Sequence, residues 1–223
     1  MMRGKFMKIN AIITAGGTSS RFGRNKLLEK VHGKEVIKYT LEAFEKSNVD
    51  EIIICSHISI IDELKDMFKN SVKVKVIEGG NTRQQSVYNG LKAGVCDYVL
   101  IHDGARPMIS AEIVNNCIEM VKDMKALTVA TKTIDTIKEV ENGKIVQTID
   151  RAKLYNTQTP QAFEYSAIRR AHDKYAGKNF TDDASMLEAL NETVYILDGS
   201  YTNIKITTQS DIEIAKIYLS NRT

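Results

Sequence analysis

Short apolar segments alternate with amphipathic segments along the first half of this chain. Continuous apolar runs indicate strands buried on both faces, and they lie at 10–14, 51–55, 73–77, 98–102 and 126–131. Apolar residues spaced three or four apart predict the intervening helices, at 34–47, 60–70, 82–93 and 111–125. This alternation predicts an α/β fold: a Rossmann-like, mostly parallel, twisted sheet with helices on both faces.

The alternation breaks after Thr131, where two β-prone runs flank Asn142 and Gly143. An Asn-Gly pair between such runs predicts a hairpin with a type I′ turn, because that turn needs positive φ angles at both positions. Two interpretations remain open at this point: an ordinary surface hairpin, or an arm that pairs with another subunit. Beyond it, the pattern predicts a strand at 194–197 and helices at 164–175, 182–190 and 210–219, the last opened by a capping box of Ser210 and Glu213.

Composition narrows the class of protein. The 223 residues are 43% hydrophobic, which suffices for one substantial core, and 31 basic against 28 acidic side chains give little reason to expect a nucleic-acid partner. Three cysteines, Cys55, Cys96 and Cys117, are widely spaced, as is typical of a reduced intracellular protein. No apolar run approaches the ~20 residues that span a bilayer, and the first apolar stretch is too short for a signal peptide. We therefore expect a cytoplasmic protein that binds neither nucleic acid nor membrane.

The loop after the first strand carries the clearest chemical signal. Residues 12–26 read IITAGGTSSRFGRNK, with Gly16 and Gly17 at the strand end and Arg21 and Lys26 further along. Adjacent glycines let backbone N–H groups approach an anion closely, and the two cations can neutralise phosphate. The spacing fits neither the GxGxxG fingerprint nor the P-loop, which disfavours a nicotinamide dehydrogenase and a P-loop NTPase. A solvated basic loop is the alternative.

Three further stretches follow predicted strands. In EGGNTRQQSV, residues 78–87, backbone groups at Gly80 and Asn81 with Ser86 behind them could read a base or ribose edge, or form a simple turn. In HDGARP, Asp103 suits a magnesium ion that keeps phosphate and water ligands, or it caps a turn. Lys205 lies in a β-like run, where a half-buried lysine needs an anionic partner or extends its ammonium to water. We find no convincing nucleophile, and cations around one carboxylate favour phosphoryl or nucleotidyl transfer.

Seven motifs occur in order: TAGGTSSRFGRNK, EGGNTRQQSV, HDGARP, DTIKEV, DRAKLYNTQTPQAF, FTDDAS and GSYTNIKITT. Together, from about residue 9 to 219, the chain resembles the 2-C-methyl-D-erythritol 4-phosphate cytidylyltransferases of the non-mevalonate isoprenoid pathway. The resemblance implies one nucleotidyltransferase domain over 1–223 that transfers CMP from CTP, with Mg²⁺, to 2-C-methyl-D-erythritol 4-phosphate and releases pyrophosphate. The alternative is the related ribitol-5-phosphate cytidylyltransferase, which makes CDP-ribitol; a catalytically inactive interaction module on this fold is disfavoured by the retained charged residues.

The resemblance also implies a role for individual residues. It assigns a catalytic role to Arg21, Lys26, Asp103 and Lys205, with Asp103 as a possible metal ligand. It assigns nucleotide binding to Ala15, Gly16, Gly17, Gly80, Asn81 and Ser86. It assigns binding of the alcohol phosphate to Thr136, Arg151, Thr159 and Thr181. It further implies a homodimer through an arm at about 132–162, with Thr136 and Arg151 serving the partner's site.

Two positions depart from the pattern of many relatives. Asn25-Lys26-Leu27 replaces the commoner Pro-Lys-Gln, so the lysine is retained while the stiffness of the loop is expected to differ. Gly104 replaces alanine, which is expected to loosen the backbone after Asp103.

Overall fold

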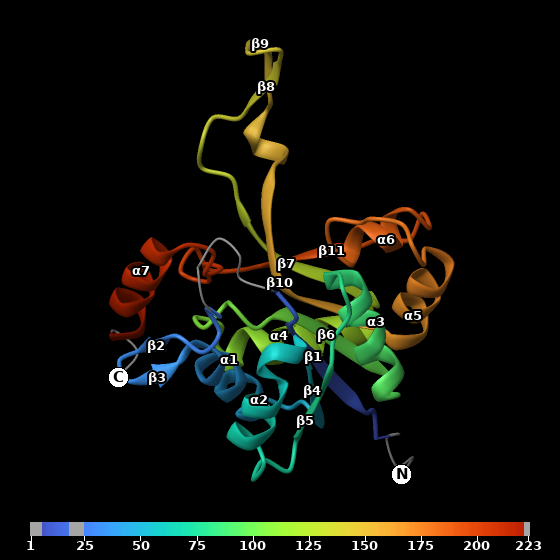
Figure 1. Ribbon diagram of the computed structural model, residues 1–223. Helices are drawn as coiled ribbons and strands as arrows, with labels where there is room; N and C mark the ends of the chain where they lie inside the picture. The colour runs from blue at the N-terminus through green and yellow to red at the C-terminus, as the bar shows by residue number, and fades with distance from the viewer. Residues whose placement is uncertain (1–5, 18–24, 221–223) are drawn as a thin grey trace.

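A seven-stranded sheet forms the centre of the protein (Figure 1). This computed structural model describes residues 6–17 and 25–220. The strands follow the spatial order β11-β7-β10-β6-β1-β4-β5. Their bounds are β1 (Ile9–Ala15), β4 (Glu51–Ser56), β5 (Val74–Glu78), β6 (Tyr98–Asp103), β7 (Ala126–Lys132), β10 (Tyr155–Glu164) and β11 (Tyr195–Asp198). Only β10 runs antiparallel to its neighbours, so the predicted mostly parallel sheet is confirmed.

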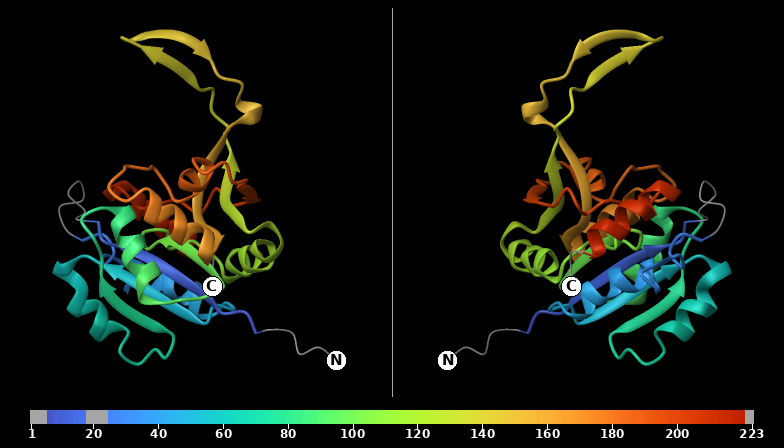
Figure 2. Two further views of the ribbon diagram at one scale, coloured as in Figure 1. Left: turned by 90° about the vertical axis from the view of Figure 1, so that its right-hand side faces the viewer. Right: turned by 90° about the vertical axis from the view of Figure 1, so that its left-hand side faces the viewer.

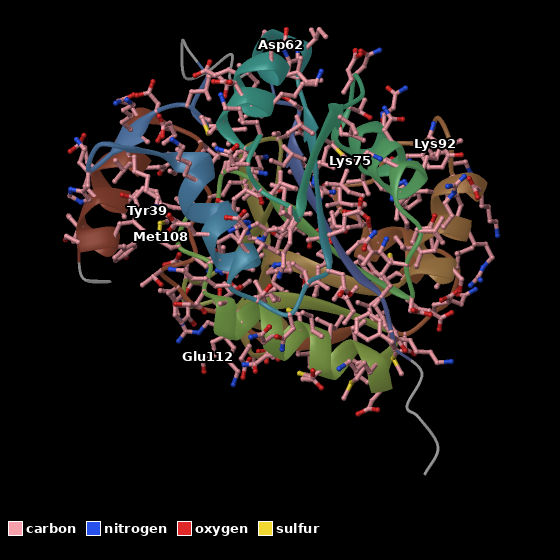
Figure 3. The ribbon with its side chains drawn as sticks, turned by 90° about the horizontal axis from the view of Figure 1, so that it is seen from below. Tyr39, Asp62, Lys75, Lys92, Met108 and Glu112 are labelled. Atoms are coloured by element: carbon pink, nitrogen blue, oxygen red, sulfur yellow. The ribbon has the colours of Figure 1, made fainter. Side chains whose placement is uncertain are left out.

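Helices cover both faces of this sheet, which explains the continuous apolar strands (Figure 2). Successive residues of β1 illustrate the pattern, because Ile13 packs into one hydrophobic cluster and Ile12 into the other. The first cluster receives side chains from α1 (Val36–Glu45), α2 (Ile61–Met67), α4 (Ala111–Met124) and α7 (Gln209–Ser220). The second receives them from α3 (Arg83–Ala93), α5 (Tyr165–Lys174) and α6 (Ala184–Glu188). From below, Asp62, Lys92 and Glu112 lie on the outer surfaces of their helices (Figure 3).

The strand β10 was not predicted from the sequence. It contains Pro160, which has no N–H to donate to a ladder, and the pairing of β10 with β7 shifts register between Thr157 and Gln161. The strand is also polar in sequence, although Gln158, Thr159 and Gln161 are all buried. A central strand with these residues does not match an apolar pattern.

The predicted hairpin is present and extends from the body (Figures 1 and 2). It pairs β8 (Lys138–Glu141) with β9 (Lys144–Thr148) in antiparallel fashion and leads into the short helix η2 (Arg151–Lys153). Asn142 and Gly143 have φ angles of 49° and 76°, as a type I′ turn requires. Residues 158–163 are buried in the sheet, so the exposed part of the arm ends earlier than the predicted limit of 162.

Smaller elements complete the chain: a two-stranded ribbon of β2 (Lys30–Val31) and β3 (Lys34–Glu35), and the short helix η1 (Ile58–Ile60). The predicted capping box of α7 is wrong by two residues. Asp211 accepts hydrogen bonds from the backbone N–H groups of Thr207 and Thr208, so Thr208 and Asp211 take the expected places of Ser210 and Glu213.

The three cysteines are all free thiols, as their spacing predicted. Cys55 and Cys117 are buried on opposite faces of the sheet, whereas Cys96 is half-buried. Within residues 6–17 and 25–220, none of the helices has the length and apolar composition needed to cross a membrane.

Candidate active site

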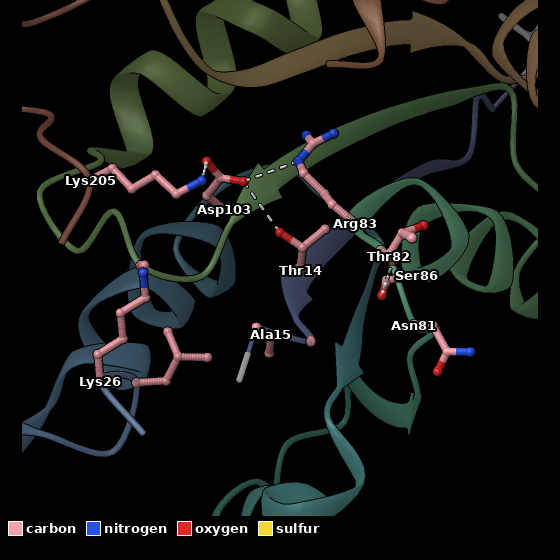
Figure 4. A pocket seen from close by; sticks show the side chains of 13 residues that line it. Thr14, Ala15, Lys26, Asn81, Thr82, Arg83, Ser86, Asp103 and Lys205 are labelled. Carbon is pink, nitrogen blue, oxygen red and sulfur yellow. Dashed lines mark hydrogen bonds and ion pairs between the residues drawn. The ribbon is translucent and has the colours of Figure 1, made fainter. Parts of the chain in front are cut away.

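A cavity of about 320 Å³ lies where β1, β5 and β6 end, at the carboxyl edge of the sheet (Figure 4). Open α/β sheets bind ligands at this edge because the loops that follow parallel strands meet there. The cavity is lined by Thr14, Ala15, Gly16, Gly17, Lys26, Leu27, Asn81, Thr82, Arg83, Ser86, Asp103, Ala105 and Lys205. The structure therefore brings together eight of the residues that the sequence analysis assigned to the site, from four separate segments of the chain.

Asp103, the last residue of β6, is held by three cations. Its Oδ2 lies 2.9 Å from Lys205 Nζ and 3.5 Å from Arg106 Nε, and its Oδ1 lies 3.4 Å from Arg83 Nε. Thr14 donates a further hydrogen bond to Oδ1 over 3.3 Å. Burial opposes ionisation of this carboxyl, but the charges of Lys205, Arg83 and Arg106 outweigh it and lower its pKa. Asp103 is therefore a carboxylate at neutral pH.

The backbone of Asp103 is fixed from the neighbouring strand. Its N–H donates to Thr159 Oγ1 over 3.1 Å, and the Thr159 hydroxyl lies 2.9 Å from His102 Nδ1. Burial lowers the pKa of His102 to about 3, so this imidazole is neutral. The hydroxyl of Thr159 therefore joins the backbone N–H of Asp103 to the imidazole of His102. The hydroxyl of Thr159, predicted to contact substrate, is thus bonded within the protein.

A second cavity of about 270 Å³ adjoins the first. The two share Arg83, Asp103 and Lys205. The remaining lining residues are Arg106, Thr157, Gln158, Thr159, Gln161, Thr181 and Asp182. Thr159 and Thr181, both assigned to the alcohol phosphate, therefore lie in this second cavity and not in the first.

On the other side of the first cavity, Ser86 joins the loops that follow β1 and β5. Its buried Oγ accepts a hydrogen bond from the N–H of Gly80 over 2.9 Å and donates to the carbonyl of Thr82. A Cβ added at Gly16 would lie 2.9 Å from the same Oγ. Gly16 thus packs directly against the first turn of α3, whereas Gly80 supports the wall of the cavity through Ser86. Asn81 lies in the lining itself.

Both departures from the family pattern have a structural account. Asn25 Oδ1 accepts a hydrogen bond from the N–H of Leu27 over 3.1 Å, an Asx turn that constrains the backbone at Lys26 without proline. At Gly104, the N–H donates to the carbonyl of Thr14, and the carbonyl accepts from the Thr40 hydroxyl. The backbone after Asp103 is therefore held on both sides, contrary to the expected loosening.

Two predicted site residues lie on the arm. Thr136 and Arg151 are exposed on the arm, and Arg151 Nη1 donates to the carbonyl of Ile134 over 2.6 Å. They line neither cavity of this subunit. Arg21 lies outside the described residues.

Arg83 and Arg106 were not predicted as site residues, although they occur in the motifs EGGNTRQQSV and HDGARP. Arg83 is the first residue of α3 and lines both cavities. Arg106 donates from Nη1 to the carbonyl of Asn203 over 2.8 Å, which ties the loop after β6 to the segment that carries Lys205. Their positions in the sequence could have identified them, because Arg83 lies three residues after Gly80 and Arg106 lies three residues after Asp103.

The side chains available as metal ligands limit how a metal ion could be held. Among the described residues, no group of three or more His, Cys, Asp or Glu side chains is arranged to hold a metal. Asp103 is the one carboxylate among the residues that line the first cavity. A single carboxylate fits a magnesium ion whose remaining ligands are phosphates and water.

A cation-rich cavity around one buried carboxylate, at the carboxyl edge of a parallel sheet, defines an α/β enzyme that acts on phosphorylated substrates. The family model of 2-C-methyl-D-erythritol 4-phosphate cytidylyltransferase matches residues 9–221. The chain belongs to this family, and the resemblance predicted from the sequence is confirmed.

Individual relatives agree with the family model. The chain is 40% identical to the 2-C-methyl-D-erythritol 4-phosphate cytidylyltransferase of Clostridioides difficile (strain 630), over 95% of this chain and 93% of that protein. It is 43% identical to that of Prochlorococcus marinus (strain MIT 9312), over 95% and 98%. Its structure is similar to that of 4-diphosphocytidyl-2C-methyl-D-erythritol synthase from Anaerococcus prevotii DSM 20548, with a TM-score of 0.87, 35% identity and 96% coverage of both chains. These findings support the methylerythritol prediction and not the ribitol alternative.

Proposed function

We propose that this protein transfers CMP from CTP to 2-C-methyl-D-erythritol 4-phosphate, forming 4-diphosphocytidyl-2-C-methyl-D-erythritol and pyrophosphate. The observation that carries the proposal is the pair of adjoining cavities that share Arg83, Asp103 and Lys205. Such a pair suits two anionic substrates that must meet at a common boundary. We assign CTP to the cavity at the end of β1 and the alcohol phosphate to the cavity beside Thr181.

The reaction needs no protein nucleophile. A phosphate oxygen of the alcohol substrate forms a bond to the α-phosphorus of CTP, while the bond from that phosphorus to the bridging oxygen of the β-phosphate breaks. Pyrophosphate leaves with the electron pair. Negative charge collects around the α-phosphorus in the transition state, and Lys26 and Lys205 in the cavity wall, together with Arg21, are assigned to neutralise it.

The nucleotide is held by groups of a different kind. We assign contacts with the triphosphate to the backbone of Ala15, Gly16 and Gly17, since glycine lets the main chain approach an anion closely. We assign the cytosine and ribose to the wall formed by Asn81 and Ser86, supported from behind by Gly80.

A magnesium ion is part of the proposal. When bound, it would neutralise phosphate charge, with Asp103 as the protein group available to hold it. Both oxygens of Asp103 already face cations, so the ion would depend mainly on the phosphates for its ligands.

The arm supports a homodimer. All residues of β8 and β9 are exposed, including the apolar side chains of Val140, Ile145 and Val146. A lone two-stranded hairpin is at best marginally stable in water, so a surface that covers it is expected. We propose that a second copy of the chain provides this surface and receives Arg151 and Thr136 beside its alcohol-phosphate cavity.

The function is tested by pyrophosphate release from CTP with purified protein and magnesium. We expect transfer to 2-C-methyl-D-erythritol 4-phosphate with a higher kcat/KM than to ribitol 5-phosphate. A preference for ribitol 5-phosphate, or no transfer to either alcohol, contradicts the proposal.

The dimer is tested by mixing two impaired variants, Arg151→Ala and Lys26→Ala, at an alcohol-phosphate concentration below the KM of Arg151→Ala. If the arm acts on the partner, a mixed dimer contains one site with both residues intact, and part of the activity returns. No recovery after confirmed subunit exchange contradicts the assignment.

A further inference from the structure

Arg83 lies between two buried carboxylates, and its shorter contact is with the one outside both cavities. Its Nη1 lies 2.7 Å from Asp183 Oδ2, whereas its Nε lies 3.4 Å from Asp103 Oδ1. Asp183 precedes α6 and lines neither of the two cavities. The direction of the guanidinium is therefore set mainly from behind the site.

Asp183 is itself rigidly placed. Its side chain is 1% exposed, and its N–H donates to the buried Oε1 of Gln161 over 3.0 Å. Its Oδ1 lies 3.1 Å from Nε2 of His172. Burial opposes ionisation of Asp183, but Arg83 and His172 lower the pKa of its carboxyl. A charged, fixed acceptor thus faces Arg83.

His172 connects this pair to two helices. It lies on α5, is buried, and its ring stacks on the ring of Tyr88 from α3, with 6.1 Å between centroids and 10° between planes. The Tyr88 hydroxyl donates to Asp173 Oδ1 over 2.7 Å. Since α3 also begins with Arg83, His172 on α5 contacts this helix through Tyr88 and contacts Asp183, the partner of the first side chain of the helix.

We propose that Asp183 and His172 are positioning residues that hold Arg83 at the boundary between the two cavities. Without the Asp183 carboxylate, the nearest anion for Arg83 is Asp103, which already pairs with Lys205. Arg83 would then move onto Asp103 and compete with Lys205 for it, which disturbs the cations that face the triphosphate. This inference rests on the proposed function, because CTP is taken as the ligand.

A double-mutant cycle tests the route through Arg83. Asp183→Asn keeps the shape of the side chain but removes its charge, and we expect it to raise the KM for CTP about tenfold, the size of a typical coupling between residues in contact. In an Arg83→Ala background the same change is expected to have no further effect on KM. Additive effects of the two substitutions overturn the proposal.

Two substitutions of His172 separate its hydrogen bond from its packing. His172→Gln retains a donor for Asp183 but loses the stacked ring, whereas His172→Phe retains the ring but has no donor. We expect the glutamine variant to keep a KM close to that of the wild type and the phenylalanine variant to resemble Asp183→Asn. The opposite order, or lower thermal stability in both without any change in KM, assigns His172 a packing role only and overturns its positioning role.

A measurement without substrate separates this inference from the proposed function. The Nε–H resonance of Arg83, assigned by its loss in Arg83→Ala, is expected to shift in Asp183→Asn and His172→Phe and to remain in place in His172→Gln. An unchanged resonance in all three variants overturns the positioning role, whatever the protein catalyses. Absence of cytidylyl transfer in the wild type contradicts the proposed function and leaves this readout intact.

Discussion

Replacement of Lys205 by alanine isolates the catalytic part of the proposal. The ammonium lies 2.9 Å from Asp103 Oδ2 and lines both cavities, so it faces the place assigned to the reacting phosphates. The side chain is 39% exposed. After its removal, Asp103 still pairs with Arg83 and Arg106, so the buried carboxylate keeps two cationic partners.

The effect on activity should far exceed the effect on stability. An ion pair with one partner this exposed contributes at most about 1 kcal/mol to folding, because water screens it. Loss of a cation that stabilises developing charge in a closed site costs at least ~100-fold in turnover, or about 2.7 kcal/mol. We therefore expect kcat to fall by at least ~100-fold while the free energy of unfolding changes little.

The chain offers a matched control in Lys216→Ala. Lys216 is 42% exposed and forms a 2.7 Å ion pair with Glu213, but it lies on the outer part of α7. Steady-state rates of pyrophosphate release and urea unfolding curves are compared for both variants. Near-normal turnover in Lys205→Ala would refute its catalytic role, and an equal loss in Lys216→Ala would show that the effect is not specific to the cavity.

Other predictions concern the arm, the carboxylate and the glycine loop. Arg151→Ala should raise the KM for the alcohol phosphate and leave CTP binding intact, with the nearby η2 residue Lys153→Ala as control; equal loss of CTP affinity contradicts the assignment. The pKa of Asp103 lies below its usual value of 3.8, so its charge stabilises the fold above that pH and this contribution is lost as pH falls. The stability difference between wild type and Asp103→Asn should therefore shrink by about 1 kcal/mol from pH 7 to pH 3 in urea unfolding, and a constant difference argues against it. Gly16→Ala would place a Cβ 2.9 Å from the buried hydroxyl of Ser86 and should weaken CTP binding in calorimetry; an affinity equal to that of the wild type would contradict this packing.

The parallel part of the fold could be predicted because its physical cause is visible in sequence. Strands such as β1 and β4 are covered on both faces, so most of their residues are apolar. The antiparallel β10 could not be predicted in this way. Gln161, for example, is fully buried only because its amide donates to Thr128 and Asp182 and its carbonyl accepts from Asp183. Partners so distant in sequence leave no local pattern.

The same reason separates the site residues that were predicted from those that were missed. Asp103 ends an apolar run and Lys205 interrupts one, so the local sequence is enough to mark each as a candidate site residue. Arg83 begins a helix, where a cation usually faces solvent, and its closest carboxylate belongs to Asp183, far along the chain. Only the tertiary structure reveals that this arginine lies at the boundary of two cavities.

The arrangement around Asp103 also indicates what this carboxylate does. Unit charges 4 Å apart interact by about 4 kcal/mol at an effective dielectric constant of 20, so three cations gathered without an anion would repel one another strongly. Asp103 offsets this repulsion and holds Lys205, Arg83 and Arg106 in place before any substrate enters. Because these charges lower its pKa, Asp103 is a poor proton acceptor near neutral pH. The proposed nucleophile is a phosphate oxygen that is already anionic and needs no general base, so the role that we propose for Asp103 is to preorganise cations rather than to transfer a proton.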